Sequence, residues 1–143
     1  METTMTIDDE MTRLVTDMYA AFASGDKSAW GGRMAQDHEV VGIGSDPEEF
    51  WVGAAKLAEV TEAQVREMSA AGLAMAGGKL RVGSQGDVAW AVDEPAMTLP
   101  NGAAVPFRMT VIAVKEAGEL RWTHFHLSAG VPNEEVLDLA LPT

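Results

Sequence analysis

The amino-acid sequence predicts an α+β domain, in which helices from the first half of the chain pack on one face of an antiparallel sheet from the second half. Two features lead to this fold class. Up to residue 70, apolar residues recur at the three- and four-residue spacing of helices, and from residue 79 onward they follow the two-residue spacing of strands. Short clusters of Gly, Asn, Asp and Ser separate the alternating runs, as turns do between strands.

The first helix is expected over residues 8–24. Thr6 can cap its N-terminus, and the acidic run from Asp8 to Glu10 is favoured by the positive end of the helix dipole. Gly25 follows as a typical end of a helix. The apolar residues fall on one side of this helix, and the resulting buried stripe consists of Met11, Leu14, Val15, Met18, Tyr19 and Phe22.

The same reasoning places the remaining elements along the chain. A short helix carrying Trp30 follows the first one, and Pro132 ends the last strand. The other predicted elements are a helix over 54–70, strands over 39–43, 79–82, 88–94, 105–115 and 120–129, and a final short helix from Asn133.

Composition limits the possible functions. The 143 residues suffice for one domain, expected over 1–143, and the net charge of −12 with ten Lys and Arg residues argues against nucleic acid and anionic membranes as partners. The absence of cysteine excludes disulfides, thiolate metal sites and a cysteine nucleophile. The polar N-terminus lacks the pattern of a signal peptide, and no apolar run reaches the ~20 residues that span a bilayer, so a cytoplasmic protein is expected.

No sequence motif for a cofactor is present. Glycine-rich phosphate loops, serine nucleophile elbows and zinc motifs are all missing. His124 and His126 lie on one side of the strand over 120–129 and could bind a metal, but further ligands would have to come from His38 or from scattered carboxylates. The sequence therefore predicts neither a cofactor nor a metal.

The predicted strand over 120–129 separates two environments. Side chains alternate between the two faces of a strand, so one face is apolar and the other carries aromatic and polar groups. The apolar face, with Phe125 and Leu127, is expected to point toward the helices. The other face is expected to be covered by a second copy of the chain, with a pocket lining as the alternative, and it consists of Trp122, His124, His126 and Ser128.

Several motifs in this order resemble the nuclear transport factor 2-like superfamily and its SnoaL-like domains: Gly25-Asp26 after the first helix, then Trp30, then Trp51-Val52-Gly53 before the long helix. The run from Trp122 to Ser128 is similar to the end of the association domain of calcium/calmodulin-dependent protein kinase II. The resemblance implies a cystatin-like cone, with N-terminal helices packed on a curved antiparallel sheet, and a homodimer through the convex side of that sheet. It implies no single chemistry, because enzymes, assembly hubs and sensors share this fold.

A candidate ligand pocket follows from the same alternation. Trp90 and Glu94 are predicted to point into the cone, because Ala89 and Ala91 are small enough for close contact between sheets on the opposite side of their strand. A partly buried carboxylate such as Glu94 could then act as a general acid or base. The predicted ligand-binding residues are Trp30, Trp90, Glu94, Met109, Phe125 and Leu127.

Arg108 is the second candidate for a catalytic role. Its parity on the strand over 105–115 places it on the convex face, where it could bond across a dimer, whereas a β-bulge would turn it into the cone, where it could anchor a carboxylate. A further acidic group around Pro47 is expected to be a solvated loop, and it consists of Asp46, Glu48 and Glu49.

These features predict a protein of SnoaL-like type that binds a small hydrophobic molecule in an apolar cone. Any catalysis there would be acid–base chemistry without a cofactor, of the isomerase, cyclase or dehydratase type, with Glu94 or Arg108 as the polar group. The alternative function is a non-catalytic association or sensor module.

Overall fold

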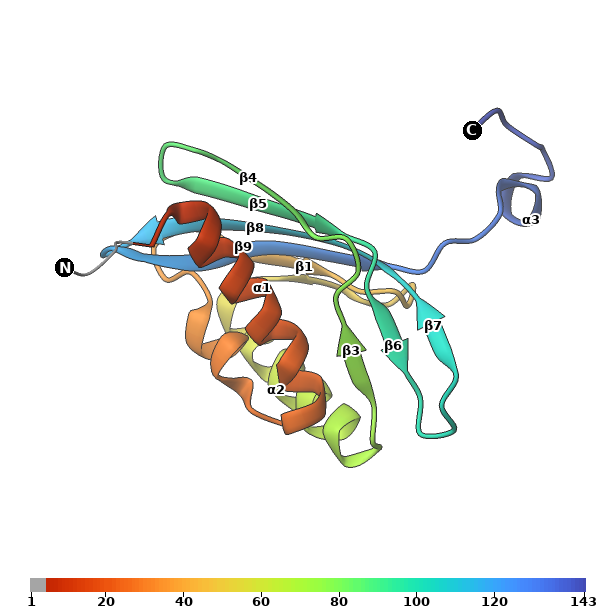
Figure 1. Ribbon diagram of the computed structural model, residues 1–143, viewed down its shortest axis with the longest axis horizontal. Helices are drawn as coiled ribbons and strands as arrows, with labels where there is room; N and C mark the ends of the chain where they lie inside the picture. The colour runs from red at the N-terminus through yellow and green to blue at the C-terminus, as the bar shows by residue number, and fades with distance from the viewer. Residues whose placement is uncertain (1–4) are drawn as a thin grey trace.

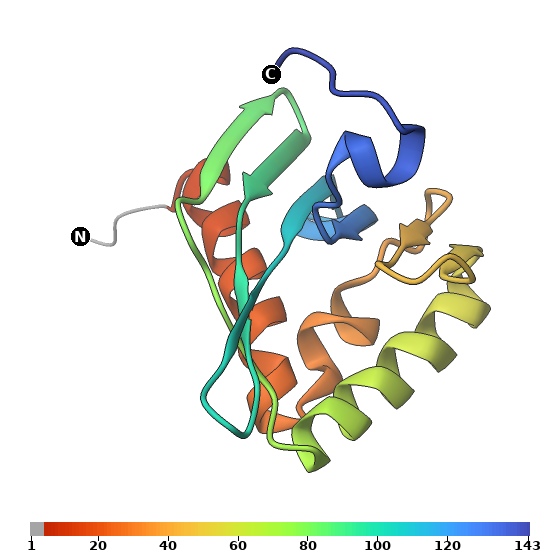
Figure 2. The same cartoon turned by 90° about the vertical axis from the view of Figure 1, so that its right-hand side faces the viewer.

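The computed structural model describes residues 5–143 and has the α+β fold that the sequence predicts. A curved six-stranded sheet crosses the molecule, and two long helices lie together on one of its faces (Figure 1). A three-stranded sheet extends from one end of the large sheet along the helices (Figure 2). We call the face of the large sheet toward the helices the inner face and the opposite face the outer face. Residues 1–4 of the predicted domain lie outside the described residues.

Most predicted elements are present within a few residues of their expected positions. The helical segments are α1 (Ile7–Ser24), the 3-10 turns η1 (Lys27–Ala29) and η2 (Gly31–Arg33), α2 (Ala54–Ala70) and α3 (Asn133–Leu137). The strands are β1 (Val41–Ile43), β2 (Phe50–Val52), β3 (Ala74–Ala76), β4 (Arg81–Gln85), β5 (Val88–Asp93), β6 (Ala96–Thr98), β7 (Ala104–Pro106), β8 (Arg108–Glu116) and β9 (Glu119–Ser128). The sequence pattern does not indicate β2, β3 and β6, because strands of three residues are too short to show a period.

The strand order of the large sheet is β2-β1-β9-β8-β5-β4. The four strands β4, β5, β8 and β9 pair in antiparallel fashion, as predicted. The expectation of a wholly antiparallel sheet is wrong at one position, because β1 runs parallel to β9. The long stretch of chain between β1 and β9, which includes α2, permits this parallel pairing. Beyond β9 the chain leaves the sheet, and α3 projects away from it (Figure 1).

The ends of α1 match their sequence signals. The Thr6 side-chain oxygen accepts a hydrogen bond from the Asp9 backbone N–H at 3.1 Å, and Gly25 adopts the left-handed conformation with φ of 78°. The apolar side of α1 packs on β5, where Ala89 and Ala91 are buried. Small residues at these inner-face positions let the helix approach the sheet closely. Among residues 5–143, no helix has the length and apolar character needed to cross a membrane.

The orientation of β5 is the reverse of the predicted one. Trp90 is 41% exposed on the outer face, where it lies against Gly83 of β4, and Glu94 is exposed beyond the end of the strand. The prediction assigned Ala89 and Ala91 to contact between sheets, whereas they make room for α1. Neither Trp90 nor Glu94 therefore points into the cone.

A β-bulge in β9 overturns the predicted position of Trp122. Ile112 of β8 pairs with His124, and the next residue of β8 pairs with Trp122, so Thr123 has no partner of its own. The extra residue reverses the alternation and turns Trp122 to the inner face. Trp122 is fully buried there, and its indole N–H donates to the carbonyl oxygen of Trp30 at 2.8 Å. Trp122 therefore belongs to the core and not to a dimer face.

A buried hydrogen bond joins α1 to the sheet. The Tyr19 hydroxyl donates to the Asp93 carboxylate at 2.9 Å, and the backbone N–H groups of Gly78 and Glu94 donate to the same carboxylate. Both Tyr19 and Asp93 are buried. Burial, followed by the bond to this carboxylate, raises the pKa of Tyr19 well above its usual value.

We expect Tyr19 to stay protonated in the folded protein where free tyrosine ionises, at about pH 10. Because the pKa is raised in the folded state, the associated stability is fully present below about pH 10 and is lost as the pH rises beyond it. Tyr19 is the single tyrosine of the sequence, so the ultraviolet absorbance of tyrosinate reports on it alone. This absorbance should appear together with the loss of native circular dichroism. Tyrosinate in a still-folded protein near pH 10 would contradict the assignment.

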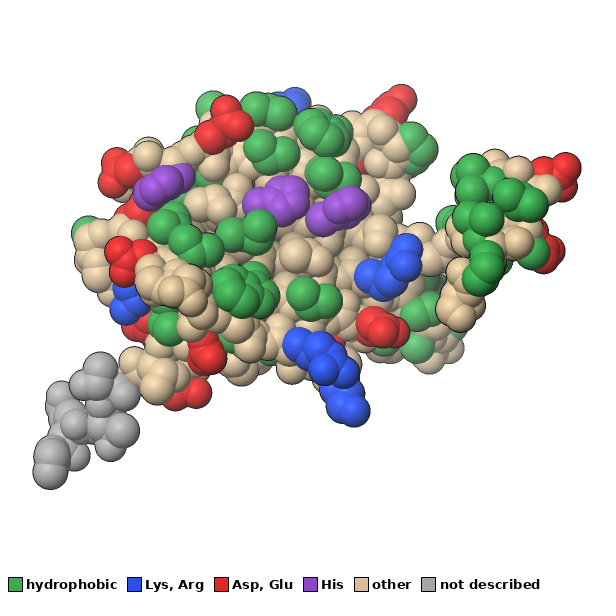
Figure 3. All heavy atoms as spheres, turned by 90° about the horizontal axis from the view of Figure 1, so that it is seen from above, with side chains coloured by type: hydrophobic (Ala, Val, Ile, Leu, Met, Phe, Trp, Pro, Cys, Tyr) green, Lys and Arg blue, Asp and Glu red, His purple; other side chains and the backbone are tan. Residues whose placement is uncertain are grey.

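The outer face of the large sheet is apolar over much of its middle, with acidic side chains mostly around the rim (Figure 3). Trp90, Val92 and Ile112 are 41%, 46% and 36% exposed there. Outward side chains of β5, β8 and β9 line up across the strands in two central rows, which are Trp90, Ile112 and His124, and then Val92, Thr110 and His126.

Candidate functional site

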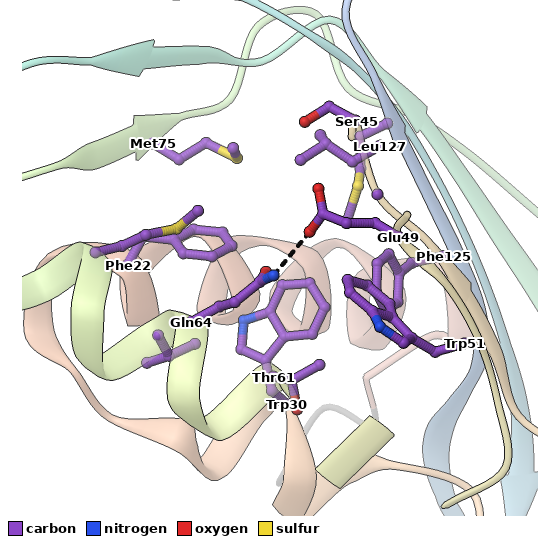
Figure 4. Close-up of a pocket in the computed structure, with 14 residues that line it drawn as sticks. Phe22, Trp30, Ser45, Glu49, Trp51, Thr61, Gln64, Met75, Phe125 and Leu127 are labelled. Atoms are coloured by element: carbon purple, nitrogen blue, oxygen red, sulfur yellow. Dashed lines mark hydrogen bonds between the residues drawn. The ribbon is translucent and has the colours of Figure 1, made fainter. Parts of the chain in front are cut away.

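A pocket lies on the inner face of the large sheet, between α2, the β1–β2 hairpin and the small sheet (Figure 4). Its volume is about 90 Å³, several times the roughly 10–15 Å³ that one water molecule needs. α2 supplies four lining residues at helical spacing, which are Thr61, Gln64, Val65 and Met68. The lining is mostly apolar, and its polar side chains are Ser45, Glu49, Thr61 and Gln64.

Two glycines, one in the middle of β1 and one directly after it, make room for this pocket. A Cβ atom on Gly42 would lie 2.6 Å from the Phe125 ring and 2.7 Å from Leu57 Cδ2, and a Cβ atom on Gly44 would lie 2.8 Å from the Glu49 side chain. Real Cβ atoms essentially never come closer than 3.0 Å to such neighbours. The inner side of β1 therefore carries no side chain at these two positions and leaves the space to Phe125 and Glu49.

Four aromatic rings form a continuous wall of the pocket. The ring centroids of Phe22 and Trp30 are 5.6 Å apart, those of Trp30 and Phe125 are 5.2 Å apart, and those of Phe125 and Trp51 are 6.4 Å apart. These separations are typical of favourable aromatic pairs. The Trp30 indole N–H donates to the carbonyl oxygen of Met18 at 3.0 Å, which fixes the central ring of the wall.

Of the described residues that line the pocket, Glu49 alone is charged. Its Oε1 accepts a hydrogen bond from the Asp46 backbone N–H at 2.9 Å, and its Oε2 accepts one from the side-chain amide of Gln64 at 2.7 Å (Figure 4). Two neutral donors thus hold the carboxylate in place, and each oxygen keeps a lone pair for a bound molecule.

Two of the four polar side chains of the lining, Thr61 and Glu49, present acceptors to a ligand. The Thr61 hydroxyl donates to the carbonyl oxygen of Leu57 at 2.7 Å, so toward the pocket it can only accept. Glu49 likewise offers acceptors when it is ionised. Chemically, the arrangement combines an apolar cavity with a fixed carboxylate that can take a hydrogen bond or a proton from a ligand.

Four of the six residues predicted to bind ligand do line this pocket, namely Trp30, Met109, Phe125 and Leu127. Trp90 and Glu94 do not, because β5 has the reverse orientation. Glu94 instead borders a separate surface groove together with Lys79 and Arg81. The predicted carboxylate of the pocket is therefore the wrong one.

Of the residues assigned to the convex face, Arg108, His124 and His126 lie where they are predicted and Trp122 does not. Arg108 is exposed at the start of β8 and pairs in register with Ser128, so it is not turned into the cone. His124 and His126 also lie on the outer face, as predicted, and His124 Nδ1 bonds to the carbonyl oxygen of Val41 at 2.9 Å. Trp122 is the exception because of the bulge.

Sequence reasoning missed Glu49, which it assigned to a solvated loop. Glu49 directly precedes β2, and the two-residue period of a strand puts it on the same side as Trp51. Trp51 faces Phe125 in the aromatic wall. The pattern Glu49-Phe50-Trp51 therefore held a signal, but the strand is too short for its period to stand out.

A second polar cluster lies away from the pocket. The buried Glu116 carboxylate accepts hydrogen bonds from the backbone N–H groups of Gln36 and Asp37 and pairs with His38 Nδ1 at 2.6 Å. Burial raises the pKa of Glu116, but these hydrogen bonds outweigh burial and lower the pKa below its ordinary value. The cluster ties the segment before β1 to the end of β8, which is a structural role.

Comparisons with known proteins agree with this fold. The sequence profile of the SnoaL-like domain family matches residues 12–133. A search of curated proteins found no match. Among solved structures, an NTF2-like protein of unknown function from Pseudomonas putida KT2440 is 20% identical with a TM-score of 0.77, over 94% of this chain and 92% of that chain.

Two further structures show the range of proteins with this architecture. A candidate ketosteroid isomerase from Parabacteroides distasonis is 15% identical with a TM-score of 0.70, over 89% of this chain and 90% of that chain. A candidate calcium/calmodulin-dependent protein kinase II association domain from Xanthomonas campestris is 20% identical with a TM-score of 0.65, over 85% and 86% of the two chains. Likeness at these identities shows the fold alone.

Proposed function

The chain belongs to the SnoaL-like domain family, and from that premise we propose that it binds a small, largely apolar molecule in the inner-face pocket and transfers a proton through Glu49. The observation that supports this most is a fixed carboxylate in a cavity otherwise lined by apolar and neutral polar side chains. The chemistry is acid–base catalysis of the isomerase, cyclase or dehydratase type, which proceeds without a cofactor.

Glu49 has the surroundings that a general base needs. The hydrogen bonds from Asp46 and Gln64 orient the carboxylate. The neighbouring aromatic wall keeps water from one side of a bound ligand, which strengthens electrostatic interactions with the carboxylate. A proton on the ligand within hydrogen-bond reach can then move to Glu49 and return to a different atom of the ligand.

Deuterium exchange at the α-carbons of cyclopentanone, followed by NMR in heavy water, tests proton transfer. We expect the protein to accelerate the exchange and Glu49→Gln, which keeps the shape but removes the base, to lower the protein-dependent rate by about 100-fold or more. Glu48→Gln is the matched control, because Glu48 is an exposed carboxylate in the same loop, and it should exchange at the wild-type rate. Equal rates for wild type and Glu49→Gln, or no acceleration by the wild type, would refute the role of Glu49.

We also propose that the protein is a homodimer, in which two copies associate through the outer face of the large sheet. Trp90, Val92 and Ile112 expose large apolar side chains next to one another on this face. A chain with a net charge of −12 repels its own copies, yet the two central rows of this face contain no carboxylate. These rows therefore offer two copies an apolar contact without repulsion between carboxylates.

An aspartate in the centre of the outer face tests the dimer. Ile112→Asp would bury an unpaired charge between the copies, so we expect the dissociation constant to rise by about 100-fold or more. Ala20→Asp, on the exposed side of α1, adds the same charge elsewhere and should leave association unchanged. Sedimentation equilibrium measures the dissociation constants of both variants. A monomeric wild type, or equal dissociation constants for the two variants, would count against the proposal.

A further inference from the structure

The described lining of the pocket carries negative charge only. This described lining contains the Glu49 carboxylate and no Lys, Arg or His side chain. None of the ion pairs among residues 5–143 includes Glu49, and its hydrogen-bond donors, the Asp46 backbone and the Gln64 amide, are both neutral. No cation of the described lining therefore offsets a negative charge on Glu49, and in a partly apolar cavity electrostatic interactions are stronger than in water.

The aromatic wall can also attract a cation wherever one of its rings presents its face. The face of an aromatic ring is electron-rich and attracts cations, most strongly in tryptophan. Trp30 and Trp51 both belong to the wall, and Phe125 lies between them, 5.2 Å and 6.4 Å from their centroids. A positive group placed between this wall and Glu49 would meet favourable interactions from two sides.

The Thr61 hydroxyl adds one more acceptor to the pocket. Thr61 can only accept hydrogen bonds toward the pocket, because its own proton is used by Leu57. An anionic ligand would find no cation to pair with and would be repelled by Glu49. The net charge of −12 of the whole chain adds a long-range attraction for cations.

We propose that the ligand of this pocket carries a compact positive group, an alkylated ammonium ion, which sits between the aromatic wall and the Glu49 carboxylate. The inference rests on the proposed function, since it names the ligand class of the same pocket. The cavity volume of about 90 Å³ suits a compact head group and excludes large ring systems unless the lining methionines move.

Choline and 3,3-dimethyl-1-butanol test this proposal, because they have the same shape and differ in the charge of one central atom. Binding is measured by titration calorimetry. We expect the wild type to bind choline about tenfold or more tightly than the alcohol. Glu49→Gln should weaken choline by about tenfold or more and change the affinity for the alcohol by less than about twofold. Glu48→Gln should behave like the wild type.

The outcomes separate this inference from the proposed function. If both probes bind with equal affinity, or if Glu49→Gln weakens both equally, the cation preference is wrong while the pocket still binds small molecules. If the alcohol binds and choline does not, the pocket selects neutral ligands and the inference fails. If neither probe binds to the wild type, both the cation preference and the proposed small-molecule site are refuted.

Discussion

Trp122→Ala should lower the free energy of unfolding by about 4 kcal/mol, whereas Trp90→Ala should lower it by less than about 1 kcal/mol. The two substitutions remove the same side chain from two strands of one sheet, β9 and β5, which flank β8. Trp122 is fully buried and packs at 5.9 Å from Trp30 and 5.5 Å from Phe125, measured between ring centroids. Its loss leaves a large cavity and removes the 2.8 Å hydrogen bond that the indole N–H donates to the carbonyl oxygen of Trp30.

Urea unfolding measures the free energy of unfolding of both variants. The protein concentration should be low and equal, because association through the outer face then contributes least to the measured stability. Should Trp122→Ala fail to fold, Trp122→Phe keeps most of the volume and should cost roughly 1–3 kcal/mol. The sequence alternation alone predicts the opposite ranking, with Trp90 inside and Trp122 outside. If Trp90→Ala lowered the free energy of unfolding more than Trp122→Ala, Trp90 would lie inside and Trp122 outside, as the alternation predicts. Such a result would contradict the bulge.

The fold class and most long elements can be predicted from the sequence, because they depend on periodicity over many residues. α1 and α2 extend over 18 and 17 residues with helical spacing, and β8 and β9 extend over 9 and 10 residues, long enough to be recognised as strands in spite of the bulge in β9. The Thr6 cap and the Gly25 end are local chemistry, and they are found where the sequence places them. The family resemblance is likewise confirmed by the match over residues 12–133.

The orientation of side chains on the sheet is less predictable, because a single extra residue reverses it. Thr123 carries no mark of the bulge, and a count of alternate positions through it assigns Trp122 to the wrong face. In β5, Ala89 and Ala91 are compatible with either face on size alone. The packing of α1 against this strand decides between them, and such packing is a tertiary property.

The candidate site likewise contains residues that can be predicted from the sequence and residues that cannot. Its apolar residues on the long strands, such as Met109, Phe125 and Leu127, follow from alternation beyond the bulge. Glu49 does not, because its place depends on the short hairpin of β1 and β2 and on a missing side chain at Gly44. Its contact with Gln64 of α2 joins positions 15 residues apart, which no local pattern shows.

The central claim is that a ligand binds on the inner side of the large sheet, beside Glu49 and the aromatic wall. Two tryptophans on opposite sides of the sheet allow a matched test, since Trp51 lines the pocket and Trp90 lies on the outer face. Removing the Trp51 ring deletes apolar contact that stabilises a bound ligand by roughly 1.5–3 kcal/mol, which corresponds to about tenfold or more in affinity. The large sheet lies between the Trp90 ring and the pocket, so this ring cannot contact a ligand bound there.

The decisive measurement is the affinity for 3,3-dimethyl-1-butanol of the Trp51→Ala and Trp90→Ala variants, by titration calorimetry after circular dichroism has shown both to be folded. We predict that Trp51→Ala loses at least about tenfold in affinity and that Trp90→Ala stays within about twofold of the wild type. Weakening by Trp90→Ala with no effect of Trp51→Ala would place the ligand on the outer face and contradict the account.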